Sequence, residues 1–174
     1  MSPLIRPFRN QAPRIAPDAF VAPGAVVIGD VEIGARASIW YGVIIRADVN
    51  VVRVGARSNI QDGTVVHVSS RKQGTFIGND VSIGHMALIH ACTLEDGCFV
   101  GMRACIMDQA VVETGAMIAA GALVTPGKRV KSGELWAGSP ARMVRLVSAE
   151  ERVEIERIAK LYADLGAEHS GAST

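Results

Sequence analysis

The sequence predicts an all-β solenoid, a left-handed parallel β-helix of hexapeptide repeats, followed by a C-terminal α-helix. Aliphatic residues recur every six positions, and glycine commonly follows them, which leaves room for a corner. Three hexads make one triangular coil, and stacked coils bury a continuous core. A spacing of six does not fit the 3, 4, 7 pattern of a helix, which frequent glycine also disfavours. The repeat gives about seven coils and comprises Ile15, Val21, Val27, Ile33, Ile39, Ile45, Val54, Ile60, Val66, Ile77, Ile83, Ile89, Leu94, Val100, Ile106, Val112, Ile118, Val124, Val130 and Trp136.

The period of six is interrupted twice. Three extra residues separate Ile45 from Val54, and five separate Val66 from Ile77. We therefore expect loops to leave the solenoid at RADVNVV and at SSRKQGT. Loops held by a rigid scaffold often carry function, so the interruptions indicate where a site lies.

The last part of the chain has a different pattern. Residues 1–147 are expected to form the β-helix domain, residues 148–165 a helix packed on it, and residues 166–174 a disordered tail. Ser148 and Glu151 match a capping box, and acidic residues fill the first turn. The face expected to lie along the solenoid comprises Ile155, Ile158, Tyr162 and Leu165.

Composition narrows the class of partner. The 18 Lys and Arg nearly cancel the 17 Asp and Glu, so no overall field favours nucleic acid or an acidic membrane. No segment has the uninterrupted apolar length of a signal peptide or membrane span, which predicts a cytoplasmic protein with a small-molecule substrate. The three cysteines lack CxxC spacing and are expected to be free thiols.

The histidines indicate a metal site. His67 and His90 each follow an inward aliphatic residue by one position, so they should point outward from one face on adjacent coils, about 4.7 to 4.9 Å apart. His85 lies in a different phase, near another edge, so a neighbouring subunit in a three-fold assembly would have to supply it. Three imidazoles with one open position are the ligand set that acidifies a metal-bound water.

Two stretches of this sequence, RADVNVVRVGARSNIQDGTVVH and IGHMALIHACTLEDGCFVGMRACIMD, closely resemble the γ-class carbonic anhydrases. The resemblance covers roughly residues 10 to 145 and is more specific than the hexads, which many acyltransferases share. It implies a homotrimer with Zn²⁺ at each subunit interface, bound by His67 and His90 of one subunit and His85 of the next. The implied substrate pair is CO2 and bicarbonate.

The resemblance also implies roles for further residues. Gln61 and Asn59 match the amides of the family site, and Gln61 is expected to orient the reacting groups because its amide both donates and accepts. Tyr162 resembles a tyrosine that short-loop relatives place near the site, although it could be a packing residue. The family's inter-subunit ion pair corresponds to Arg46, Asp48 and Asp62.

The sequence departs from the archetypal enzyme at two places that serve proton transfer. Val49 replaces a glutamate, and the acidic loop after the first histidine is the short, basic SSRKQGT. We therefore expect slow hydration, since turnover requires a route for a proton.

Two alternatives to CO2 hydration remain open from the sequence. An acyltransferase using coenzyme A is the first alternative, because WAGSPARMVR resembles a segment near the coenzyme site of hexapeptide enzymes. A non-catalytic metal-binding scaffold trimer is the second. The metal itself is also open, since three imidazoles and water suit Zn²⁺, Co²⁺ or Fe²⁺.

Overall fold

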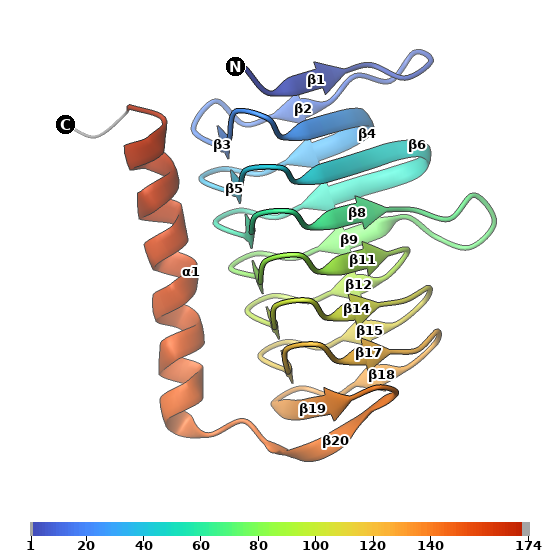
Figure 1. The fold of residues 1–174 in the computed structure, drawn as a ribbon, viewed down its shortest axis with the longest axis vertical. Helices are drawn as coiled ribbons and strands as arrows, with labels where there is room; N and C mark the ends of the chain where they lie inside the picture. Colours follow the sequence, from blue (N-terminus) through green and yellow to red (C-terminus); the bar gives the residue numbers. More distant parts are fainter. Residues whose placement is uncertain (1, 172–174) are drawn as a thin grey trace.

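A computed structural model describes residues 2–171. The chain forms a parallel β-solenoid of stacked coils with a single helix along one side (Figure 1), which confirms the predicted left-handed β-helix of hexapeptide repeats. Within the described residues, no helix combines the length and the apolar character needed to cross a bilayer.

The walls of the solenoid belong to two sheets. One sheet contains β1 (Leu4–Arg6), β2 (Arg14–Ile15), β4 (Val26–Ile33), β6 (Ile44–Val54), β8 (Val65–His67), β9 (Thr75–Ile77), β11 (Leu88–His90), β12 (Thr93–Leu94), β14 (Cys105–Ile106), β15 (Val111–Val112), β17 (Leu123–Val124) and β18 (Arg129–Val130). The other contains β3 (Phe20–Val21), β5 (Ser38–Ile39), β7 (Asn59–Ile60), β10 (Ser82–Ile83), β13 (Phe99–Val100), β16 (Met117–Ile118), β19 (Glu134–Gly138) and β20 (Ala141–Leu146). All recorded pairings between these strands are parallel except that of β19 with β20.

The repeated aliphatic residues form the core in columns. Ile60, Ile83 and Val100 are direct neighbours in register along β7, β10 and β13, and none of them is exposed to solvent. Burying an aliphatic side chain contributes roughly 1.5 to 3 kcal/mol, so each coil stabilises the next. The three cysteines are free, as predicted, and burial raises the pKa of the Cys92 and Cys98 thiols.

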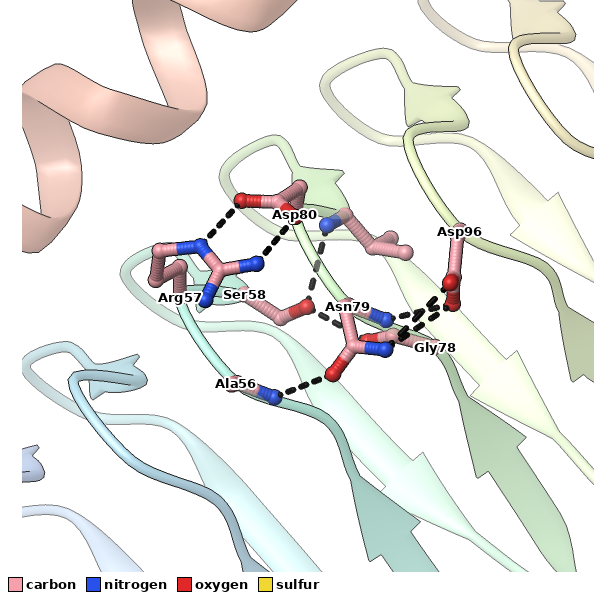
Figure 2. A network of polar contacts seen from close by, with 8 residues as sticks. Ala56, Arg57, Ser58, Gly78, Asn79, Asp80 and Asp96 are labelled. Carbon is pink, nitrogen blue, oxygen red and sulfur yellow. Dashed lines mark hydrogen bonds and ion pairs between the residues drawn. The ribbon is translucent and has the colours of Figure 1, made fainter.

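Hydrogen bonds and an ion pair also join successive coils at one corner (Figure 2). The Arg57 guanidinium donates to both carboxylate oxygens of Asp80, at 2.7 and 2.6 Å, one coil further on. Asn79 accepts from the backbone N–H of Ala56 at 2.9 Å, and its own backbone N–H donates to Asp96 at 2.7 Å. These contacts fix the stacking of adjacent corners.

The two interruptions of the repeat take different forms. The first prediction, a loop at RADVNVV, is wrong: these residues belong to the long strand β6, which bends and pairs with β4 through a register shift between Gly29 and Val31. Gly29 has φ of +84°, and a Cβ there would lie 2.1 Å from the carbonyl oxygen of Ala47, so this close approach requires glycine. The second interruption contains an irregular loop between β8 and β9, as expected.

The C-terminal helix α1 (Ala149–His169) packs against β3, β5, β7 and β10. The predicted capping box is present. Ile155 is buried, as expected, but Ile158, Tyr162 and Leu165 are only half-buried. The other buried residues of the helix are all small; they are Ala159, Ala163 and Gly166.

The expected disordered tail is wrong for residues 166–169, which continue α1. Tertiary contacts hold this end of the helix. A Cβ on Gly166 would lie 3.1 to 3.2 Å from Ser38 and Phe20, and the ring of His169 packs edge-on against Trp40. The last predicted tail residues, 172–174, lie outside the described part of the chain.

Candidate metal centre

His67 and His90 lie side by side on one wall of the solenoid. They end β8 and β11, and strand register makes them direct partners on adjacent coils, which confirms their expected phase match. The Nδ1 atom of His67 and the Nε2 atom of His90 are 3.2 Å apart, and the ring centroids are separated by 5.2 Å. One nitrogen of each ring therefore faces the other ring.

The remaining nitrogen of His67 contacts a carboxylate. Asp48, on β6, places Oδ1 3.1 Å from His67 Nε2, and the Arg46 guanidinium donates to Oδ2 of Asp48. Burial opposes ionisation of Asp48, but the hydrogen bonds from His67 and Arg46 outweigh it and hold its pKa below the usual range. Asp48 is thus an anionic partner for this imidazole.

His90 has an equivalent partner that did not stand out in the sequence. Asp108 places Oδ1 2.7 Å from His90 Nδ1, and Lys72 from the loop after β8 lies 3.3 Å from Oδ2. Burial raises the pKa of Asp108, but the bonds from His90 and Lys72 have the larger combined effect and lower it. The signal was present in the repeat, because Asp108 follows His90 by 18 residues, which is three hexads and one full coil.

His85 lies in a second group, at the corner that follows β10. Its Nδ1 atom is 2.9 Å from Oδ2 of Asp62, and the side chain is 39% exposed. Tyr162 of α1 lies close by: burial and, to a smaller extent, the negative charge of Asp62 raise the pKa of its hydroxyl. The Tyr162 ring also packs edge-on against Trp40, at 5.3 Å between centroids.

The two amide residues belong to the edge that carries His85. Asn59 is fully buried and donates to Ser82 Oγ at 2.8 Å, while Gln61 is 5% exposed and donates to Asn59 Oδ1 at 3.0 Å. This chain of hydrogen bonds leaves Oε1 of Gln61 as an acceptor and fixes the direction of its amide.

One chain therefore presents two half-sites on different sheets. The first comprises His67, His90, Asp48, Asp108 and Arg46, and the second comprises His85, Asp62, Gln61, Asn59 and Tyr162. Across residues 2–171, no three His, Cys, Asp or Glu side chains converge in a way that could hold a metal ion. Arg46 contacts Asp48 within the chain, and no contact between Arg46 and Asp62 is recorded among the described residues.

The first half-site fits two ligands of a zinc ion. Zinc–nitrogen bonds of about 2.0 to 2.1 Å in a tetrahedral site place two ligand nitrogens roughly 3.3 Å apart. The facing nitrogens of His67 and His90 are 3.2 Å apart. Each ring has a carboxylate on its other nitrogen, which is the usual second contact of a zinc-bound imidazole.

Comparison with known proteins agrees with the hexapeptide repeat and with the solenoid fold. Residues 12–47 match the family described as bacterial transferase hexapeptide (six repeats). A solved structure of a hexapeptide transferase family protein from Anaplasma phagocytophilum superposes with a TM-score of 0.91 at 47% identity, covering 95% of this chain and 97% of that one.

Two relatives named as carbonic anhydrases match nearly the whole chain. Gamma carbonic anhydrase 2, mitochondrial, from Arabidopsis thaliana is 48% identical over 95% of this chain, which spans only 61% of that relative. The carbonic anhydrase of Geobacillus kaustophilus is 37% identical over 94% of this chain and 89% of its own length. With its solenoid fold and this identity to carbonic anhydrases over nearly its whole length, the chain belongs to the γ-class carbonic anhydrase family.

Proposed function

We propose that this protein is a homotrimeric, zinc-dependent enzyme that reversibly hydrates CO2 to bicarbonate. The observation that carries the proposal is the arrangement of its histidines. His67 and His90 face each other at 3.2 Å, and His67, His85 and His90 each contact a carboxylate of their own. Family membership makes CO2 the substrate that this arrangement favours.

The proposed complete site joins the first half-site of one subunit to the second half-site of its neighbour. His67 and His90 would supply two ligands and His85 of the adjacent copy the third. Zn²⁺ held by three imidazoles provides a nucleophile near neutral pH, because it lowers the pKa of bound water. Co²⁺ or Fe²⁺ would suit the same ligands.

An apolar column beside the first half-site supports assembly with a second copy. Outward-facing residues stack in register along this wall, and Ile44 and Leu88 remain 40% and 37% exposed in the single chain. A contiguous exposed apolar strip next to an incomplete site is typical of a protein interface. The column comprises Val26, Ile44, Val65, Leu88, Cys105 and Leu123.

The remaining side chains have roles that follow from their contacts. Gln61 would orient CO2 and bicarbonate through its amide, which Asn59 holds in place. Asp48 and Asp62 would fix the imidazoles of His67 and His85. Arg46 would hold Asp48 and form an ion pair with the neighbouring subunit. Tyr162 lies near Asp62, where its hydroxyl would contact the substrate. Its ring packing on Trp40 fits a structural role as well.

Proton export should limit turnover in this protein. Val49 is 44% exposed and carries no titratable group where the archetype has a carboxylate. The loop after β8 is basic, and its Lys72 already contacts Asp108. We therefore expect kcat to rise with the concentration of a small buffer such as imidazole while kcat/KM stays nearly constant.

The cytoplasmic location and the lack of nucleic-acid and membrane partners also stay predictions.

The decisive experiment measures the metal, oligomeric state and activity of protein purified without chelators. We expect one zinc per subunit in a trimer and measurable CO2 hydration by stopped flow. His85→Ala should lose zinc yet keep its far-UV circular dichroism, because His85 lies outside the core. His169→Ala is the matched control, since this fourth histidine packs on Trp40 away from the proposed ligands and its loss should leave zinc content unchanged.

Each alternative gives a different result. A stable monomer with full zinc content would contradict the shared site. Metal-free protein that transfers an acyl group from coenzyme A would establish the transferase function suggested by the name of the Anaplasma structure. A zinc-replete trimer without hydration activity at any buffer concentration would establish the scaffold.

A further inference from the structure

We propose that Lys72 and Asp108 act as a positioning pair for His90. In this pair, Asp108 fixes the hydrogen on one imidazole nitrogen and Lys72 fixes the orientation of Asp108. The inference deepens the proposed metal site and rests on it. It assigns a role to the basic loop that replaces the acidic loop of the archetypal enzyme.

The contact of Asp108 determines which nitrogen of His90 is available. Its Oδ1 lies 2.7 Å from Nδ1 of His90, and its side chain is 15% exposed. A neutral imidazole has one N–H, so a carboxylate at Nδ1 favours the hydrogen there and leaves the lone pair on Nε2. Nε2 is the atom that faces His67 at 3.2 Å. The carboxylate thus presents the nitrogen that a metal would need.

Lys72 holds the other oxygen of the same carboxylate. Its Nζ atom is 3.3 Å from Oδ2 of Asp108, so the two oxygens have separate partners. The loop that presents Lys72 is closed by a bond from Ser69 N–H to the Gln73 carbonyl at 3.2 Å. It is also anchored to β6, where the Asn50 amide donates to the Ser69 carbonyl at 3.0 Å. The loop is therefore held in the place from which Lys72 reaches Asp108.

The two histidines on this wall have parallel surroundings. Arg46, Asp48 and His67 form one cation–carboxylate–imidazole series, and Lys72, Asp108 and His90 form the other. Lys72 is therefore the counterpart of Arg46, supplied by the loop rather than by the strand. A carboxylate on a ligand imidazole commonly improves metal affinity by 10-fold to 100-fold.

The test measures zinc affinity by competition with a chromophoric chelator at fixed pH, using the full-length protein in its native assembly. Asp108→Ala should weaken zinc binding by about 10-fold to 100-fold. Lys72→Met, which keeps the aliphatic stem, should weaken it by at most about fivefold, because the ion pair is partly exposed. Since Lys72 acts through Asp108, adding Lys72→Met to Asp108→Ala should cause no further loss.

Controls separate this inference from a general effect on folding or on the site. Arg71→Met removes a cation of the same loop that forms no recorded ion pair with the residues described by the structure, so zinc affinity should stay unchanged. Asp108→Asn keeps an acceptor oxygen without the charge and should give an intermediate loss. In Co²⁺-substituted protein, the visible absorption bands should shift with Asp108→Asn but not with Arg71→Met. If Asp108→Ala does not fold, the Asn variant decides the result.

Failure of the proposed function and failure of the positioning pair would give different results. Wild-type protein that binds no zinc would sink the proposed function. Wild-type protein that binds zinc as tightly as its Asp108→Ala and Asp108→Asn variants would overturn only the positioning pair. Additive losses from the Lys72 and Asp108 variants would show that Lys72 does not act through Asp108.

Discussion

The coils that carry the three candidate ligand histidines and the coils that follow them share one repeat but differ inside. Between residues 93 and 130 the small inward positions are Cys or Ala, as at Cys98, Ala104 and Ala116. Between residues 38 and 92 many buried positions are polar instead. Every buried polar side chain of the described residues lies in this part of the chain, and these residues are Ser38, Ser58, Asn59, Gln61, Thr64, Thr75 and Ser82.

The polar residues change how the corners are held together. In the regular coils a corner closes on itself, as where the Ala104 N–H donates to the Gly101 carbonyl at 3.2 Å. At the corner that carries His85, the Thr64 hydroxyl of the preceding coil intervenes. It donates to the Gly84 carbonyl at 3.1 Å and accepts from the Ala87 N–H at 3.2 Å.

Ser58 does the same at the neighbouring corner. Its hydroxyl donates to the Gly78 carbonyl at 2.6 Å and accepts from the Val81 N–H at 2.9 Å (Figure 2). The hexad therefore fixes which residues point inward, whereas polarity at the small positions decides how rigidly one coil holds the next. Rigid coupling is concentrated where the proposed ligands need fixed positions.

Replacing a polar residue of a histidine-bearing coil should change catalysis most. Gln61 occupies a corner position that Gly101 and Ala119 fill in later coils. Gln61→Ala therefore gives a site coil the small residue of a regular one. Loss of one positioned amide should lower kcat for CO2 hydration on the order of 100-fold while zinc content stays unchanged. Stopped-flow hydration assays on zinc-replete protein measure this directly.

The control for this variant is Asn59→Ala, which removes the residue that holds the Gln61 amide rather than the amide itself. A smaller rate loss is expected, together with lower stability, because Ser82 then loses its buried partner. An unchanged rate in Gln61→Ala protein with full zinc content would make Gln61 structural.

An intermediate effect concerns the hydroxyl that ties the His85 corner to the preceding coil. Thr64→Val keeps the side-chain volume but removes both hydrogen bonds of a fully buried hydroxyl. The free energy of unfolding should fall by about 1 to 3 kcal/mol in urea denaturation. Thr93→Val in the regular coils is the matched control, because Thr93 is half-buried, and should change stability by less than about 0.5 kcal/mol. Equal effects in the two variants would remove the proposed difference between the coils.

These contrasts mark the limit of what could be predicted from the sequence. The period of six gave the solenoid and placed His67 beside His90, because both are consequences of strand register. It could not show that the hydroxyls of Thr64 and Ser58 form hydrogen bonds with the backbone of the next coil, since a hexad pattern treats Ser, Thr and Ala alike as small. The partners of His90 were missed for another reason: Asp108 lies one coil away and Lys72 on a loop, so their meeting depends on three-dimensional stacking.

The end of α1 was also mispredicted from local pattern alone. Residues 166–169 show no helical periodicity, yet Gly166 fits closely against Phe20 and Ser38, and the Tyr41 hydroxyl lies 2.9 Å from Nδ1 of His169. The start of the helix was predicted correctly because a capping box is a local arrangement. It depends on residues three apart in the chain and not on the solenoid.

The capping box, which is determined locally, should contribute less to the free energy of unfolding than the hydrogen bonds that join the coils. Hydrogen bonds from the Arg145 guanidinium and then from the Ser148 N–H lower the pKa of Glu151 to about 2, from 4.5. A carboxyl group with a depressed pKa contributes stability that is present above its ordinary pKa and is lost as the pH falls through its folded value. Wild-type protein should therefore be slightly more stable than Glu151→Gln above pH 4.5, and the difference should shrink steadily as the pH falls toward 2. Urea denaturation across this range measures the difference, which should be small because Glu151 is solvent-accessible and screened. Stability profiles that run parallel down to pH 2 would mean that the charge of Glu151 contributes nothing to stability. A difference as large as that of Thr64→Val would mean that the helix and the coils unfold as one tightly coupled unit.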